Sequence, residues 1–168
     1  YTLRTLFPYT TLFRSGSNKP FVTISTLDSL AYNLAYTDGI ICPILDALRD
    51  NVYTALYTFK DCELNRISDY INISINELIT MLKDKDCNIS FVGDGTTKFK
   101  DKLLANLSNV SFAPAHLNLA KASSLGELGL NLLNNGIFDD IYASVPIYLR
   151  KPQAEREYEE KMRQKKNE

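Results

Sequence analysis

The sequence predicts an α/β domain built on a five-stranded mixed sheet with helices on both faces. Three early stretches, 40–46, 52–59 and 64–73, are rich in β-branched and aromatic residues and predict strands. The polar breaks between them, 48–51 and 60–63, are short enough for hairpin turns, so the three strands form an antiparallel meander. From residue 74 the pattern changes to helix, strand, helix, strand, helix, which places helices on the faces of the same sheet.

The first strand of the meander, residues 40–46, is a continuous apolar run, as expected of a strand that is covered on both faces. Pro43 lies within it and removes one hydrogen-bond donor from the ladder, so we expect a bulge there. Upstream, residues 19–25 read as a short strand that leads into a helix over 27–36, whose leucines and alanines recur at helical spacing.

The predicted helix over 74–84 has the clearest start signal in the chain. Ser74 and Glu77 have the spacing of a capping box, and Ile73 and Leu78 are placed to form a hydrophobic staple around it. Strands over 88–92 and 110–113 and helices over 97–107 and 118–134 complete the pattern. Small residues among the leucines of the last helix predict close packing against the sheet, and Gly136 suits the left-handed residue after its end.

Composition excludes several classes of protein. A chain of 168 residues with 45% hydrophobic content is long enough for one domain with a proper core. A net charge of −1 argues against broad binding of a nucleic-acid backbone. The three cysteines have no metal-type spacing and are odd in number, which indicates reduced, intracellular thiols. With no apolar run near the ~20 residues of a membrane span and no export signal, we expect a soluble cytoplasmic protein.

Both ends of the chain differ from the middle, so we divide it into a leader (1–17), a domain (18–150) and a tail (151–168). Residues 1–15 contain no acid and repeat Thr-Leu-Phe, and they resemble the translated sequencing-adaptor peptide that contaminates assembled genomes. We interpret the leader as non-native or disordered; a transit-like presequence is the weaker alternative. The strongly charged tail predicts a solvated helix that frays, in preference to a docking helix for a partner.

The sequence contains few residues that could take part in catalysis or bind a ligand. His116 is the only histidine, so neither a Cys/His metal site nor a Ser/His/Asp triad is indicated, and no catalytic or metal-binding residue is predicted. Gly93 and Gly95 belong to a strand-to-helix turn that can receive a phosphate, although such turns need glycine for geometry alone. Asp46 ends the first strand, but the glycine-rich sequence that a magnesium–phosphate site needs does not follow it. These three residues are weak cofactor-binding candidates, and no cofactor is predicted.

Three stretches of the chain resemble one family: Ile24-Ser-Thr-Leu-Asp-Ser-Leu-Ala31, Pro43-Ile-Leu-Asp-Ala-Leu-Arg-Asp-Asn-Val-Tyr53 and Val145-Pro-Ile-Tyr-Leu-Arg-Lys-Pro-Gln-Ala-Glu155. They resemble the bacterial TsaB (YeaZ) proteins, and the last stretch is the most specific. The resemblance implies an actin-like ATPase (ribonuclease H-like) fold of two duplicated domains, and the predicted element order is that of one such domain. It also implies a non-catalytic scaffold, the dimerisation subunit of the tRNA N6-threonylcarbamoyladenosine modification complex.

The resemblance implies partners as well. The family's catalytic ATPase is a separate TsaD-type subunit, a TsaE-type ATPase joins the intact complex, tRNA is met only through the complex, and no membrane is involved. Residues of a protease, which older names of the family suggest, are not seen in the sequence. At position 48 the chain has leucine where the family commonly has arginine.

The likeness covers about residues 18–160 and begins in the middle of the family's chain. We therefore expect a truncated protein that keeps the second domain and lacks the first, with its glycine-rich loop. Apolar surface that normally meets the first domain, including the helix over 27–36, would then favour self-association. One alternative is a fragment of an actin-fold, nucleotide-dependent enzyme, a kinase or carbamoyltransferase, although this half lacks phosphate-loop features. Another is an α/β domain with no retained role.

The interpretation of the leader gives a testable prediction. Deletion of residues 1–15 should leave the thermal midpoint of unfolding nearly unchanged, because their leucines and phenylalanines have no counterpart in the predicted domain. Differential scanning calorimetry of the full chain and the deletion variant measures this. A fall of more than a few degrees would show that the leader is structural, since ~1 kcal/mol shifts the midpoint of such a domain by roughly 2–8 °C.

Overall fold

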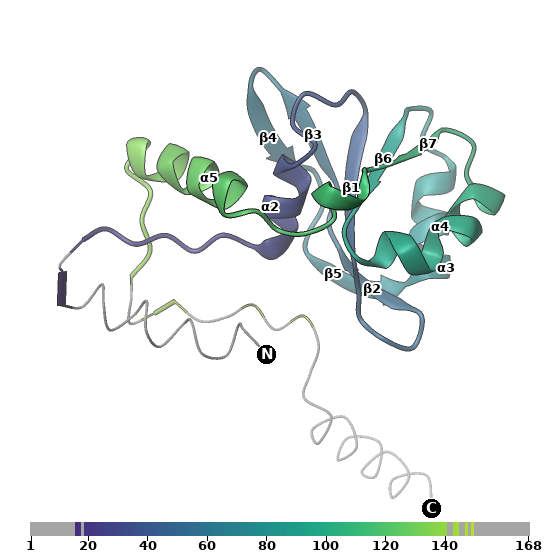
Figure 1. The fold of residues 1–168 in the computed structure, drawn as a ribbon, viewed down its shortest axis with the longest axis horizontal. Helices are drawn as coiled ribbons and strands as arrows, with labels where there is room; N and C mark the ends of the chain where they lie inside the picture. The colour runs from purple at the N-terminus through teal and green to yellow at the C-terminus, as the bar shows by residue number, and fades with distance from the viewer. Residues whose placement is uncertain (1–15, 18, 141–142, 145–146, 148, 150–168) are drawn as a thin grey trace, which may run out of the picture.

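A computed structural model describes residues 16–17, 19–140, 143–144, 147 and 149 (Figure 1). The predicted tail and almost all of the predicted leader lie outside the described residues. The strands are β1 Ile40–Asp46, β2 Asn51–Thr54, β3 Tyr57–Lys60, β4 Glu63–Arg66, β5 Ile71–Ser74, β6 Ile89–Val92 and β7 Val110–Phe112. The helices are α2 Thr26–Tyr32, α3 Ile75–Lys83, α4 Gly95–Asn106 and α5 Ala122–Asn134, with a short 3-10 helix, η1, at Ala115–Leu117.

The seven strands form five rows of one mixed sheet, with β1 in the middle. On one side of β1 lies β6, which is parallel to it, and β7 is parallel to β6. On the other side β2 and β3 are antiparallel to β1 and continue one another in a single register, from Asp46↔Val52 to Ile41↔Tyr57. The outermost row consists of β5 beside β2 and β4 beside β3. The predicted five-stranded mixed sheet is confirmed, although two of its predicted strands are divided.

The division of strands 52–59 and 64–73 begins at Pro43. The gap between β2 and β3, Ala55–Leu56, stands opposite Cys42–Pro43, where proline supplies no N–H to the ladder. In the next row the four residues 67–70 stand opposite this two-residue gap, so that row bulges. The expected bulge in β1 itself is wrong, because β1 keeps its register with both neighbours and the irregularity is displaced into them.

Helices cover both faces of the sheet, as predicted. Even-numbered residues of β1 (Ile40, Cys42 and Ile44) join the buried residues of α3 and α4, whereas Ile41 joins those of α2. This alternation follows from the two-residue period of a strand. Figure 1 shows α3 and α4 together on one side of the sheet and α2 on the other. Burial raises the pKa of the Cys42 thiol to about 12, so this cysteine behaves as a small core residue.

Capping boxes begin two of the helices. At α3 the Glu77 N–H donates to Ser74 Oγ at 3.2 Å and the Ser74 N–H donates to Glu77 Oε2 at 2.8 Å, which confirms the predicted start. These bonds hold the pKa of Glu77 below its usual value. A second box, Ser25 with Asp28, begins α2. That helix ends at Tyr32, four residues before its predicted end.

Asp28 also connects α2 to the sheet through hydrogen bonds. Its carboxylate accepts hydrogen bonds from the hydroxyls of Tyr57, at 2.7 Å, and Tyr70, at 2.6 Å. Burial first, and then the adjacent Asp28 carboxylate, raises the pKa of both tyrosines, that of Tyr70 to about 12. Both hydroxyls therefore keep the protons that they donate. The Arg66 guanidinium lies 4.0 Å from the centre of the Tyr70 ring and covers it.

Residues 19–25 are extended but form no strand, so that prediction is wrong. Instead of joining the sheet, this segment bonds to the chain after α5. The Asp139 N–H donates to the Phe21 carbonyl at 2.8 Å, and the N–H and hydroxyl of Thr23 both donate to Asp139 Oδ2 at 2.6 Å. The segment thus lies on the outside of the domain, beside α5 (Figure 1).

The predicted packing of the last helix against the sheet is also wrong. α5 packs on α2 and on the extended segment, where Gly129 faces the side chains of Val22 and Ile24. The Asn33 side chain joins α2 to α5. Its NH₂ group donates to the carbonyls of Leu117 and Leu119, which precede α5, and its oxygen accepts from the Ser124 hydroxyl at 2.7 Å. Gly136 has the expected left-handed backbone, with φ +73°.

The packing of α3 gives a testable prediction. Leu78 is fully buried, whereas Met81 on the same helix is 40% exposed. Replacement of Leu78 by alanine should lower the free energy of unfolding by about 2–5 kcal/mol, because it leaves a cavity in the core. Met81→Ala, the matched control, should change it by less than about 0.5 kcal/mol. Urea denaturation measures both, and equal effects would contradict the assignment of the α3 face.

Candidate functional site at the ends of β1 and β6

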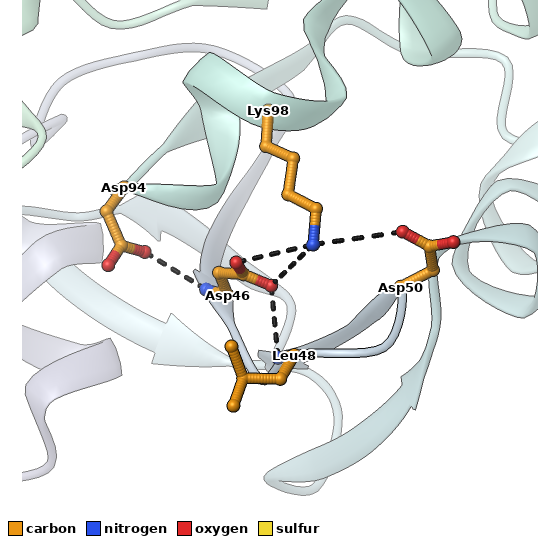
Figure 2. Close-up of polar contacts among 5 residues, drawn as sticks. All are labelled: Asp46, Leu48, Asp50, Asp94 and Lys98. Atoms are coloured by element: carbon orange, nitrogen blue, oxygen red, sulfur yellow. Dashed lines mark hydrogen bonds and ion pairs between the residues drawn. The ribbon is translucent and has the colours of Figure 1, made fainter.

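The three weak candidates from the sequence lie together in the structure. Asp46 ends β1, Gly93 follows β6, and Gly95 begins α4. Since β1 and β6 are parallel neighbours, their carboxyl ends meet at one edge of the sheet, which is where open α/β sheets commonly bind ligands. Figure 2 shows the polar contacts at this edge, with Asp46 between Asp94 and Lys98.

Both glycines are required by a close approach of the turn to β1. Gly93 has φ +112°, a backbone conformation that L-residues rarely adopt, and a Cβ atom there would overlap the carbonyl oxygen of Ile44. At Gly95 a Cβ atom would lie 3.0 Å from the same oxygen. The turn therefore rests directly on the backbone of β1, which favours the geometric reason for these glycines over a phosphate-binding one.

The polar groups of the turn bond within the fold. The Gly93 N–H donates to Asn118 Oδ1 at 2.9 Å, and the hydroxyl of Thr96 donates to the Gly93 carbonyl at 2.7 Å. Asp94 is the N-cap residue of α4 but makes no side-chain cap; its Oδ1 accepts the N–H of Asp46 at 3.0 Å instead. The turn thus connects β6, the end of β1 and the loop before α5.

Lys98 on α4 is the residue that sequence reasoning missed. Its ammonium group lies 3.1 and 3.3 Å from the two carboxylate oxygens of Asp46 and 3.8 Å from Asp50 (Figure 2). The side chains of Lys98 and Asp46 are 41% and 29% exposed, so the ion pair contributes no more than about 1 kcal/mol. The sequence predicts a helix over 97–107 after the strand over 88–92, and Lys98 lies near its start. That position beside the end of the strand could have identified it.

The turn between β1 and β2 has an unusual backbone. Leu48, Arg49 and Asp50 have φ values of +64°, +53° and +58°, and none of them is glycine. Left-handed backbone costs roughly 1–2 kcal/mol for each such residue. Hydrogen bonds close the turn, since the N–H of Leu48 donates to Asp46 Oδ1 at 3.1 Å and the N–H of Asn51 to the Leu48 carbonyl. Lys98 lies between the acids at its two ends, so it also holds this turn.

The polar groups of this site bond to other residues of the domain, and these bonds stabilise the fold. The Asp46 carboxylate already has Lys98 and the Leu48 N–H as partners, and the Gly93 N–H has Asn118. Within the described part of the chain, no three His, Cys, Asp or Glu side chains are grouped so that they could hold a metal ion. His116 is exposed in η1. A shallow, open pocket of about 330 Å³ lies elsewhere, between α2 and α5, where Tyr32, Lys121 and Glu127 line it.

The close approach of the turn to β1 gives a testable prediction. Gly93→Ala should destabilise the domain by at least about 1–3 kcal/mol, because alanine is strained at this φ and its methyl group meets backbone rather than a movable side chain. Gly126→Ala in α5 is the matched control: a Cβ atom there meets no neighbour within 4 Å, and the change should stabilise the helix by up to about 1 kcal/mol. Thermal unfolding of both variants distinguishes them, and a neutral Gly93→Ala would refute the close approach.

The chain is similar to known proteins of tRNA modification. The model of the tRNA N6-adenosine threonylcarbamoyltransferase family (TsaD) matches residues 9–158. A protein of Bacillus subtilis (strain 168), named tRNA threonylcarbamoyladenosine biosynthesis protein TsaB, is 34% identical over 137 residues. The match covers 81% of this chain and 58% of that protein, so the chain spans a little more than half the length of this relative.

Two solved structures from Pseudomonas aeruginosa share the fold at 17% sequence identity. One is an uncharacterized protein with similarity to the peptidase YeaZ, with a TM-score of 0.72 over 88% of this chain and 67% of that one. The other is YeaZ itself, with a TM-score of 0.68 over 85% and 66%. The predicted actin-like (ribonuclease H-like) fold is confirmed. The chain belongs to the TsaB (YeaZ) family of tRNA threonylcarbamoyladenosine proteins.

Proposed function

We propose that residues 18–150 are the second actin-like domain of a TsaB-type subunit, a non-catalytic scaffold and dimerisation subunit of the complex that makes tRNA N6-threonylcarbamoyladenosine. The observation that carries this proposal is the 34% identity to a protein named for that biosynthesis. The matched family model, whose description names the same tRNA modification, supports it as well.

The contacts at the ends of β1 and β6 support a non-catalytic role. A phosphate group at this edge needs backbone N–H groups and a cation that are free to turn toward it. Here the Gly93 N–H is engaged by Asn118 and the Lys98 ammonium by Asp46. A nucleotide would have to break both contacts, so binding at this edge would be weak.

The partners that we propose follow from the family. A TsaD-type ATPase subunit is the principal partner and supplies the catalytic chemistry, and a TsaE-type ATPase joins the intact complex. The tRNA is met through the complex, which agrees with a net charge of −1 on this chain. The proposed location is the cytoplasm. In the part of the chain that the structure describes, no helix combines the length and the apolar character that a membrane span needs.

The alternative, a fragment of an actin-fold kinase or carbamoyltransferase, is not favoured by the relatives found. It makes a different prediction about nucleotide binding. An enzyme of this type should bind Mg-ATP with micromolar affinity and turn it over without a partner. The scaffold should do neither, and isothermal titration calorimetry with a coupled phosphate-release assay distinguishes the two.

A chimera tests the proposed role directly. We expect that residues 18–168 alone fold but do not co-elute with a TsaD-type ATPase on size-exclusion chromatography. Fusing the unmatched part of the Bacillus subtilis relative to residues 18–168 should restore co-elution with the ATPase of that organism. It should also restore threonylcarbamoylation of tRNA when the TsaE-type protein and an activated threonylcarbamoyl donor are added. The relative itself is the positive control.

Two outcomes would contradict this proposal. If the chimera is folded by circular dichroism but supports no modification, the domain is not a functional TsaB second domain. If residues 18–168 alone co-elute with the ATPase at micromolar concentration, the surface that binds the partner lies on this domain or on the charged tail.

A further inference from the structure

The extended segment before α2, the helix α5 and the chain just after that helix form an outer layer of the domain, which we call the strap (residues 19–25 and 122–139). Figure 1 shows α5 at the edge of the molecule, away from α3 and α4. Only Ser124 and Gly129 of α5 are buried. Within the described chain, neither of the two hydrophobic clusters of the core includes a residue of the strap. The strap therefore lacks the buried apolar contacts that give core elements the stability of the whole domain.

Polar contacts hold the strap to α2. The sequence predicts a free apolar face on this helix, and that prediction is wrong because three of its apolar residues are buried against the sheet: Leu27, Leu30 and Ala31. Toward the strap, Asn33 accepts the Ser124 hydroxyl at 2.7 Å. Ser29, one turn before Asn33, is 1% exposed, and its hydroxyl has no partner among the described residues. Water can bond to all three side chains when the strap unfolds, so this contact resists unfolding weakly.

The two parts of the strap contact one another directly. A Cβ atom on Gly129 would lie 3.5 Å from the side chains of both Val22 and Ile24, so the helix and the extended segment touch. The Asp139 carboxylate accepts both the N–H and the hydroxyl of Thr23 at 2.6 Å. Hydrogen bonds to a carboxylate are stronger than those between neutral groups. Because each part of the strap stabilises the other, we expect the two parts to unfold together.

The loop that leads into α5 connects the strap to the ends of β1 and β6. The Asn33 side chain donates to the carbonyls of Leu117 and Leu119 at 2.8 and 3.0 Å, so one residue holds both this loop and α5. Asn118, between these two leucines, accepts the Gly93 N–H at 2.9 Å. When α5 unfolds, the loop loses its attachment on that side, and Asn118 is free to move away from Gly93.

We propose that the strap is a separate cooperative unit, which unfolds locally while the rest of the domain stays folded, and that its unfolding releases the Gly93 N–H from Asn118. The strap thus determines whether a hydrogen-bond donor at the ends of β1 and β6 is engaged or free. This inference is independent of the proposed function, since it needs neither an ATPase nor tRNA.

Native-state hydrogen exchange of the full chain, followed by NMR, tests the proposal. Asp139→Ala removes the side-chain bonds to Thr23 and leaves the bond between Gly93 and Asn118 untouched. The amides of α5 and of Gly93 should exchange faster by one common factor of at least about fivefold, because amides that exchange through the same opening share its free energy. The amides of β1 and α3 should keep their rates. Asp101→Ala, which removes an exposed acid of α4, is the matched control and should accelerate none of these amides.

A second variant guards against misfolding of the first. Thr23→Val removes only the hydroxyl, so a smaller acceleration of the same amides is expected. Unchanged exchange in both variants would overturn the proposal, and so would equal acceleration in β1 and α3, which would show that strap and core unfold together. Acceleration confined to residues 19–25 would show that the strap is not one unit. Acceleration of α5 without Gly93 would show that its unfolding does not reach the edge of the sheet.

Discussion

The site depends on one close contact, between the backbone of β1 at Ile44 and the turn that follows β6. Both glycines of that turn lie against the Ile44 carbonyl oxygen, and a side chain at Gly93 would overlap it. Because the turn lies directly against the backbone of β1, α4 begins over the end of that strand and Lys98 comes within reach of Asp46. Asp94 accepts the N–H of Asp46 for the same reason. The polar cluster is thus a consequence of backbone packing, and a ligand is not needed to explain it.

A missing hydrogen-bond donor shapes the opposite side of the sheet. Pro43 interrupts the ladder that joins β1 to the next row, and the interruption reappears as the Ala55–Leu56 gap. Ser68, in the bulge opposite, accepts the N–H of Leu56 at 2.8 Å and so satisfies a donor that the ladder leaves unpaired. The same row carries Tyr70, whose hydroxyl reaches Asp28 at the start of α2. One proline in the central strand is in this way linked to the attachment of a helix two rows away.

Sequence reasoning succeeded where the signal is local. The capping box of α3 occupies four consecutive residues, Ser74 to Glu77, and the apolar run of β1 is continuous, so both were predicted at nearly the observed bounds. It failed where the cause lies far along the chain. The gap at Ala55–Leu56 depends on a proline twelve or more positions earlier, and the contact of Lys98 with Asp46 spans 52 positions. The three site candidates lie together because the ends of parallel neighbouring strands meet at one edge of the sheet. The sequence did not show that the Gly93 N–H bonds to Asn118 and the Asp46 carboxylate to Lys98, because only the packed structure gives the positions of these two partners.

The packing of α5 shows why composition alone misplaced a helix. Small residues among leucines indicate close approach to some surface, and the sequence predicts the sheet as that surface. In the structure Gly129 approaches Val22 and Ile24 instead. The face of the sheet beneath is already covered by α2, whose Leu27, Leu30 and Ala31 are buried there. α5 is therefore left as an outer layer, and its Leu125 and Leu130 stay 46% and 53% exposed. The order of the layers, from the sheet to α2 to α5, therefore accounts for a leucine-rich helix of which only Ser124 and Gly129 are buried.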